Sequence, residues 1–227
     1  MRKIVKTSAP ANYIALITQL QYREQDILAG VHPGAIGRDL FDNLKLNAEY
    51  KLLKRQLVEE QGYICCYCNC RIGITGETTE HILPIDTHIQ LLAEYNNLLV
   101  SCNHSRTQRH TDRTYPNHCD ASKKSDILPL TPLNIISDCL FNYQVSDGSI
   151  SSLDNDCTDV IKILQLDCSK LRDNRLSALN NILFDNSGQL LTQHELELIF
   201  EDIDKKDSNG MYHPYFKCIE YCIYCLI

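Results

Sequence analysis

Residues 62–70 read Gly-Tyr-Ile-Cys-Cys-Tyr-Cys-Asn-Cys, and Cys65 and Cys68 within them have the Cys-x-x-Cys spacing of a zinc knuckle. Because two thiolates leave a tetrahedral ion half coordinated, a second pair is needed, for which Cys102 and Cys119 are the candidates. Five of the eight histidines also lie between residues 65 and 119: His81, His88, His104, His110 and His118. This clustering favours a metal site over ordinary reduced thiols.

The composition bounds the class of protein. With 227 residues, of which 44% are hydrophobic and 22% charged, the chain can bury a core of one or two domains. No apolar run approaches the roughly 18 residues that a membrane helix needs, and no apolar segment of the kind found in secretion signals follows the basic N-terminus. We therefore expect a cytoplasmic protein without membrane contacts, whose 12 cysteines are metal ligands or buried thiols rather than disulfides.

The pattern along the chain predicts an α+β protein, mostly helical, around a small cysteine-rich module. Three segments are expected: an N-terminal helical segment (1–60), the module with its knuckle (61–130), and a mostly helical C-terminal region suited to binding a partner (131–227). Apolar periodicity, turn residues and a capping box predict the individual elements: helices over 11–29, 46–60 and 169–184, a strand near 78–85, a polar loop over 103–118, a hairpin at Asp147-Gly148, and a helix capped by Thr192 and Glu195.

The dipeptide Glu80-His81 places a carboxylate and an imidazole side by side between the two cysteine pairs. A carboxylate can hold a hard divalent cation, and an imidazole with a near-neutral pKa can take a proton from water. On a regular strand the two side chains point to opposite faces, unless the strand bends or ends there. Asn97, further along, can brace a loop or add a neutral oxygen ligand.

The order of these motifs resembles the zinc-stapled branch of the HNH, or ββα-metal, endonucleases. The order is Cys-x2-Cys, acidic-His-x2-Pro, Asn-Leu-Leu-x2-Cys and Cys-Asp-x2-Lys. The stretches GYICCYCNCRI, EHILP, NNLLVSC, HCDASKKSD and LQLDCSKLRDNRLSAL fall in the order seen in the HNH nuclease subunit of Septu-type and retron-associated antiphage defence systems. The resemblance covers nearly the whole chain up to residue 190, and it implies a metal-dependent endonuclease that hydrolyses phosphodiester bonds, with DNA favoured.

The resemblance also implies roles for single residues. Cys65, Cys68, Cys102 and Cys119 match structural zinc ligands. His81 matches the general base, Glu80 the ligand of a catalytic divalent ion, and Asn97 the residue that braces the loop. Asp120 falls where the last His or Asn of the motif stands, and Lys123 matches the lysine that often follows.

Two departures from the family pattern matter. Sixteen residues separate Cys102 from Cys119, where two are usual, so His104 or His118 could replace a thiolate. Asp120 makes the site more anionic, which favours Mg²⁺ or Mn²⁺ over a softer metal.

The distribution of charged residues along the chain indicates where nucleic acid or a protein partner could bind. The chain has a net charge of −7, and residues 131–227 hold 7 basic against 15 acidic residues. Nucleic acid contacts are therefore expected in the short basic stretch, through Arg106, Arg109, Lys123 and Lys124. The resemblance implies an ATPase subunit of the ABC or SMC-like type as partner, joined in retron systems by a reverse transcriptase and its RNA–DNA product.

Two other functions stay open: a non-catalytic, zinc-stabilised binding subunit, and an HNH nuclease that cleaves RNA such as tRNA. A purely structural zinc module does not need the Glu80-His81 pair, which favours catalysis. Nothing in the motif separates DNA from RNA, because both present the same phosphodiester. Cys218, Cys222 and Cys225 could form a second metal site with Cys139, Cys157 or Cys168, but buried core cysteines are the favoured interpretation.

Overall fold

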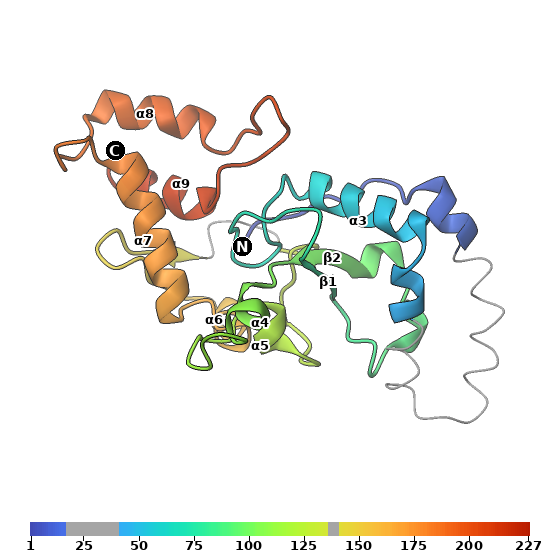
Figure 1. Cartoon of the computed structure of the whole chain (residues 1–227). Coiled ribbons are helices and arrows are strands. Elements are labelled where there is room, and N and C mark those ends of the chain that lie inside the picture. Colours follow the sequence, from blue (N-terminus) through green and yellow to red (C-terminus); the bar gives the residue numbers. More distant parts are fainter. Residues whose placement is uncertain (17–40, 136–140) are drawn as a thin grey trace.

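The computed structural model describes residues 1–16, 41–135 and 141–227 (Figure 1). Within them helices predominate and each of the two sheets has two strands, which confirms the α+β class. The elements follow in the order α3 (Ala48–Glu60), β1 (Thr78–His81), η1 (Ile89–Leu91), η2 (Tyr95–Asn97), β2 (Leu98–Ser101), α4 (His104–Gln108), α5 (Asp120–Lys123), β3 (Asn142–Tyr143), β4 (Ile150–Ser151), α6 (Asn155–Leu164), α7 (Ser169–Leu183), α8 (Gln193–Asp202) and α9 (Phe216–Tyr224).

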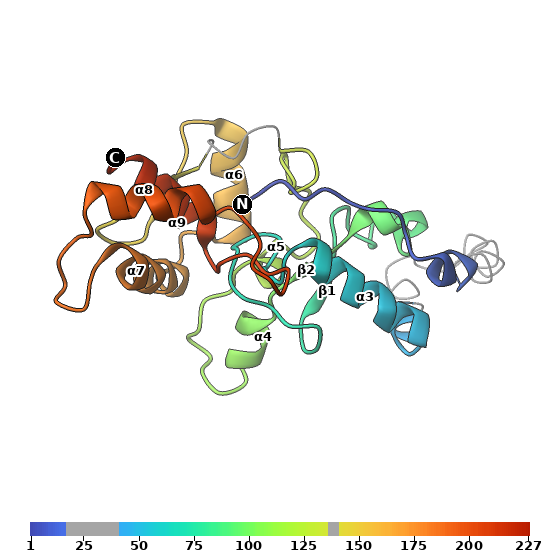
Figure 2. The ribbon, with the colours of Figure 1, turned by 90° about the horizontal axis from the view of Figure 1, so that it is seen from above.

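The centre of the cysteine-rich module is the antiparallel pair β1 and β2. Glu80 lies opposite Leu99 and His81 opposite Leu98 in this register. Helix α3 packs against β2 through an apolar stripe that includes Leu53 and Leu57, both fully buried. Figures 1 and 2 both show α3 beside the two strands, with α7, α8 and α9 grouped at the other end of the molecule.

The knuckle is a tight turn between α3 and β1. The Cys65 N–H donates to the Cys70 carbonyl at 2.9 Å, and Asn69 between them adopts a left-handed conformation with a φ of 61°. Asparagine tolerates this conformation better than most residues. The Cys66 N–H donates to the Val100 carbonyl at 3.1 Å. The turn is thereby joined to β2, which fixes the knuckle thiols relative to the sheet.

Gln61, at the end of α3, ties the same parts together. Its side chain is buried, donates to the carbonyls of Ile64 (2.9 Å) and Val100 (2.8 Å), and accepts the Val100 N–H at 2.7 Å. One side chain thus binds three backbone groups of the knuckle and of β2, of which the Val100 carbonyl also accepts the Cys66 N–H.

The C-terminal half closes over the other side of the knuckle. Helix α9 packs against α7, α8 and β3, and the Tyr215 N–H at its start donates to the Asn69 carbonyl at 2.8 Å. At the end of α6, the Leu164 carbonyl accepts the Cys119 N–H at 2.8 Å. The cysteine-rich module is therefore held from both α6 and α9.

The first residues of the chain run between the two halves. Met1 is buried, and the Ile4 N–H donates to the Pro132 carbonyl at 2.7 Å. Lys6 donates to the Leu98 carbonyl at 3.1 Å and forms an ion pair with Glu60 at 3.3 Å. One buried hydrophobic cluster consequently includes residues from all three predicted segments.

Several predicted elements are confirmed: α3, α7, the β3–β4 hairpin, and the capping box of α8 formed by Thr192 and Glu195. The expected loop over 103–118 contains the short helix α4, and α6 was not anticipated. Of the helix expected over 11–29, residues 11–16 are helical and the remainder lies outside the described residues. Cys218 and Cys222 are buried in the core, as favoured, but Cys225 is exposed, which corrects that interpretation for the last turn of the chain; Cys139 lies outside the described residues.

None of the helices in the described ranges combines the length and the hydrophobicity that crossing a lipid bilayer requires.

The Gln61→Leu variant is expected to lose about 2 kcal/mol of unfolding free energy, because the Ile64 carbonyl and the Val100 N–H lose this partner while the Val100 carbonyl keeps the Cys66 N–H. The loss is measured by chemical denaturation. Gln90→Leu, at an exposed position of η1, is the control and should change stability by less than about 0.5 kcal/mol. Equal stability of the two variants would show that Gln61 does not hold the knuckle.

Candidate metal and catalytic site

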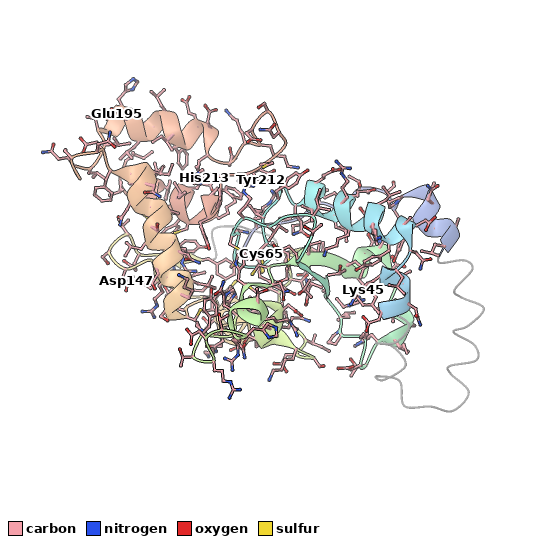
Figure 3. The ribbon with its side chains drawn as sticks, viewed as in Figure 1. Lys45, Cys65, Asp147, Glu195, Tyr212 and His213 are labelled. Carbon is pink, nitrogen blue, oxygen red and sulfur yellow. The ribbon has the colours of Figure 1, made fainter. Side chains whose placement is uncertain are left out.

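Buried sulfur atoms converge where the knuckle, the end of β2 and the start of α5 meet. The sulfur atoms of Cys65 and Cys119 are 4.0 Å apart, and those of Cys68 and Cys102 are 3.9 Å apart. All four side chains are buried, and Cys65 lies near the middle of the molecule (Figure 3). The structure thus brings together the two cysteine pairs that the sequence predicted, across the sixteen intervening residues.

The spacing of these sulfur atoms suits a tetrahedral ion. A zinc–sulfur bond of about 2.3 Å places two sulfur ligands about 3.8 Å apart at the tetrahedral angle. The observed separations of 4.0 and 3.9 Å are close to this value. The Cys102 N–H also donates to the Cys65 sulfur at 3.3 Å, a contact that stabilises a thiolate. The cluster could therefore hold a metal ion such as zinc.

The same cluster offers more than four ligands. The ligand atoms of Cys65, Cys68, Cys70 and Cys102 lie within 4.8 Å of one another, and so do those of Cys102, His118 and Cys119. His118 is buried, and its Nδ1 lies 3.3 Å from the Cys119 sulfur. The geometry keeps His118 as an alternative ligand, and it also places the thiol of Cys70 within reach of the same ion.

His104, the other alternative, lies at the edge of this cluster. Its Nδ1 is 3.8 Å from the Cys70 sulfur. It belongs to neither of the two groups whose ligand atoms are mutually close among the described residues. His104 is thus a weaker candidate than His118.

The thiols do not share one ionisation state. Burial alone would raise the pKa of Cys65, but hydrogen bonds from Cys102 and Cys119 lower that pKa well below its usual value. Burial raises the pKa of Cys119 well above its usual value. A thiolate is therefore stabilised in the cluster by its protonated neighbours, and a cation would take over that role.

The predicted acidic pair also meets in the structure. Glu80 on β1 and Asp120 at the start of α5 lie near each other, and the Asp120 carboxyl group raises the pKa of Glu80. Glu80 is buried, and its Oε1 accepts from the Tyr67 hydroxyl at 2.8 Å and pairs with the Lys123 ammonium at 2.9 Å. Asp120 is partly exposed and pairs with Arg106 at 2.7 Å. The two carboxyl groups thus lie side by side, with Glu80 on the buried side and Asp120 on the side that faces solvent.

The surroundings raise the pKa of Glu80 to about 8. Burial is the largest cause, the Lys123 ammonium opposes it, and the Asp120 carboxyl adds to it. Two adjacent carboxyl groups tend to keep a proton between them when no cation is bound. Their oxygen atoms are the ligands that Mg²⁺ and Mn²⁺ prefer, so the donor set fits a hard divalent ion.

His81 projects from the other face of β1. Its Nε2 lies 2.9 Å from the Leu92 carbonyl, and its ring meets the edge of the Phe41 ring with centroids 4.5 Å apart. A carbonyl only accepts, so Nε2 carries the proton and Nδ1 is the basic nitrogen of the neutral ring. Burial lowers the pKa of His81 to about 4, which keeps the ring neutral near pH 7. The side chains of Glu80 and His81 therefore project from opposite faces of β1, as expected for neighbouring residues of a regular strand.

Asn97 is buried and braces the loop between β1 and β2. Its Nδ2 donates to the carbonyls of Leu83 (3.0 Å) and Leu91 (3.2 Å), and its Oδ1 accepts the Leu83 N–H at 2.8 Å. Its oxygen is used by a backbone N–H in this arrangement, which favours the bracing role over that of a metal ligand.

The four residues predicted to contact nucleic acid do not form one surface. Lys123 is 1% exposed and is bound to Glu80, so its assignment to nucleic acid was wrong. The Lys123 ammonium also donates to the His81 carbonyl at 3.0 Å, so this side chain is directed into β1 rather than toward solvent. Arg106 is exposed but paired with Asp120, and Arg109 donates to the Tyr115 carbonyl at 2.9 Å. Lys124 is exposed.

Comparison with known proteins gives one partial similarity. No protein-family model matches the chain. The chain is similar to the Septu protein PtuB of Bacillus thuringiensis. The two sequences are 31% identical over 119 residues, which make up 51% of this chain and 42% of that protein. The chain thus spans less than half the length of this relative, and the similarity supports the Septu part of the resemblance seen in the motifs.

Sequence reasoning missed two residues of the site. Tyr67, inside the knuckle, is fully buried and donates its hydroxyl to Glu80, which connects the metal cluster to the acidic pair. Phe41 covers one edge of His81. The position of Tyr67 between two cysteines was a usable signal, because a tyrosine buried there needs an acceptor for its hydroxyl. No comparable pattern pointed to Phe41.

Purified protein is expected to hold about one zinc ion per chain, with Cys65, Cys68, Cys102 and Cys119 as ligands. Cys65→Ser and Cys119→Ser should lose the zinc and lower the thermal stability. Cys66→Ser is the matched control, because Cys66 is also buried but belongs to neither close group. Metal analysis of the purified variants measures the zinc content.

Two results would contradict this ligand set. Retention of a full zinc ion by Cys65→Ser would exclude Cys65. Loss of zinc in His118→Ala, together with its retention in Cys119→Ser, would assign the fourth position to His118 instead.

Proposed function

We propose that the protein is a metal-dependent endonuclease of the HNH type that serves as the nuclease component of a Septu-like antiphage defence system. The observation that carries the proposal is the meeting of Glu80 and Asp120 one residue away from Cys119 of the buried sulfur cluster. A cluster that only stabilises the fold has no need for paired carboxyl groups at its edge. The similarity to a Septu protein supports the biological setting.

In this proposal Glu80 and Asp120 hold the divalent cation. Tyr67 and Lys123 both contact Oε1 of Glu80, which leaves Oε2 as the oxygen for the cation. Asp120 forms the partly exposed side, from which a substrate phosphate approaches. When bound, Mg²⁺ or Mn²⁺ would polarise the phosphate and relieve the charge on the leaving oxygen.

His81 supplies the base. Because Nε2 is bound to the Leu92 carbonyl, Nδ1 takes the proton from the attacking water. The Leu92 contact and the Phe41 edge fix the ring orientation before substrate arrives. Since Glu80 and His81 project from opposite faces, the scissile phosphate would sit at the end of β1, where both can reach it.

A zinc-stabilised binding subunit without catalysis is the second candidate. The observation in its favour is the burial of Glu80 and its ion pair with Lys123, which also serves to fasten α5 to β1. In that function His81 would be a packed core histidine. The two candidates differ in whether removal of His81 changes anything besides stability.

His81→Ala is expected to lower the cleavage rate by about 10² to 10⁴, the usual cost of losing a positioned general base. His110→Ala, at an exposed position in the loop after α4, is the control and should cleave like the parent. Cleavage of plasmid DNA with Mg²⁺ is measured, and zinc content and melting temperature are checked in both variants. Parent-like cleavage by His81→Ala would remove His81 from the mechanism and favour the second candidate.

We further propose that an ATPase subunit brings the nuclease to its substrate. Residues 131–227 hold 15 acidic against 7 basic residues, which weakens attraction to a polyanion and offers a docking surface for a basic partner. DNA is the favoured substrate and RNA the alternative.

Cleavage of long DNA at moderate salt should rise by about 10²-fold or more when the ATPase encoded beside the nuclease is added, because docking raises the local concentration of substrate. The same comparison with RNA tests the alternative substrate. Full activity of the chain alone at moderate salt would show that no such partner is required.

A further inference from the structure

A groove of about 500 Å³ lies between α3 and the chain that leads into β1. Three lysines line its helical side: Lys45, Lys51 and Lys54. Residues 74–79 line the opposite side and contribute Thr75 and Thr78. Lys51 and Lys54 belong to α3 and Lys45 to the helical turn before it, all N-terminal to the cysteine-rich stretch.

The groove is cationic. Lys45 is exposed and pairs with Asp42 at 2.8 Å, a solvent-screened contact that a stronger anion can replace. Lys51 is exposed and has no ion-pair partner among the described residues. Lys54 donates to the Glu77 carbonyl, and its pKa is lowered by burial in the groove, with the Lys45 charge adding to the effect.

The acidic residue in the groove does not cancel this charge. The Oε2 of Glu77 accepts the Asn103 N–H at 2.8 Å, and the Glu77 charge raises the pKa of Lys54 against the lowering by burial, so it offsets part of the charge of one lysine. Among the residues that line the groove, Glu77 is the single acidic one against three lysines. Such a surface attracts an anion that is long enough to meet more than one lysine.

One end of the groove lies near His81. Thr79, in the wall of the groove, and His81 lie on the same face of β1, because strand residues alternate between faces. The Lys45 ammonium lies 4.6 Å from the centre of the Phe41 ring, and that ring meets the His81 ring with centroids 4.5 Å apart. The Phe41 ring therefore connects the Lys45 end of the groove to His81, although neither Phe41 nor His81 lines the groove itself.

We propose that this groove binds the sugar–phosphate backbone of a nucleic acid strand and directs it to His81, an inference that rests on the proposed nuclease function. Lysine ammonium groups and threonine hydroxyls are common ligands of phosphate oxygens. The aromatic side chain in the lining, Tyr50, is buried and donates its hydroxyl to Thr79, so it offers no face for stacking a base. Contacts of this kind hold the backbone without reading sequence.

This surface replaces the one expected from the sequence. Lys123 is buried against Glu80, and Arg106 is occupied by Asp120. Lys45, Lys51 and Lys54 provide the cationic track on the His81 side of β1, whereas Arg106 lies on the Glu80 side. Figure 3 shows Lys45 at the end of α3 that is remote from the C-terminal helices.

The test compares the Lys45→Gln/Lys51→Gln double variant with Lys205→Gln in the full-length, zinc-loaded chain. Lys205 is the matched control, since it pairs with Asp202 at 2.7 Å with the same sequence spacing as Lys45 and Asp42 at 2.8 Å. Binding of labelled single-stranded DNA and of RNA of the same sequence is measured by fluorescence anisotropy without Mg²⁺, over a range of salt concentrations.

The double variant should bind about tenfold more weakly, and the magnitude of the slope of log K against log salt should fall by about 1.4, the value for two lost phosphate contacts on a single strand. Lys205→Gln should match the parent. The polymer that shows the larger loss identifies the bound nucleic acid as DNA or RNA. The proposal that the groove binds nucleic acid would be overturned by an unchanged slope in the double variant. It would also be overturned if the parent chain bound neither polymer at low salt.

Cleavage with Mg²⁺ separates this inference from the nuclease itself. If the parent cleaves nucleic acid and the double variant binds it normally, the proposed role of the groove is wrong and the proposed nuclease function is retained. If the slope falls as expected and the parent does not cut with its partner present, the groove stands as a binding surface and the proposed nuclease function fails.

Discussion

The convergence of buried cysteine sulfur atoms is the constraint on which the rest of the site depends. The sulfur atoms come from the knuckle, the end of β2 and the start of α5, three segments that are far apart in the sequence. Buried thiols at van der Waals distance from one another gain little unless a cation binds them. A bound ion would therefore supply the energy that joins α5 to the strands, as expected for a module with a small core.

The position of the acidic pair follows from this cluster. Asp120 is one peptide bond from Cys119, and the Cys119 N–H is fixed by the Leu164 carbonyl of α6. Tyr67 stands between Cys66 and Cys68 and reaches Glu80. The sulfur cluster and the acidic pair are thus linked, because residues of one are adjacent in sequence to residues that belong to or contact the other. A change in the sulfur cluster is expected to move the carboxylates with it, so an ion bound there would fix the position of the acidic pair.

The distribution of charge around β1 separates two tasks. On the Glu80 face, Lys123 and Arg106 balance the two carboxylates, so this face has no cationic surplus for a polyanion. On the His81 face, lysines of α3 exceed the acidic groups of the groove. A substrate held on the second face would meet the acidic pair at the edge of the strand. The strongly acidic C-terminal half favours substrate delivery through another subunit.

The sequence by itself determined the local features of this protein. The knuckle turn, α3, α7, the β3–β4 hairpin and the capping box of α8 follow from spacing and periodicity within short windows, which depend on neighbouring residues alone. The order of the motifs along the chain also identified Cys119 as a candidate metal ligand and Asp120 as a candidate residue of the acidic site. Tertiary packing decided the rest: the burial of Lys123, the pairing of Arg106 with Asp120, and the alignment of Lys45 with His81. These contacts join segments far apart in the chain, and no local pattern fixes which charged side chain becomes buried when a helix packs on a strand.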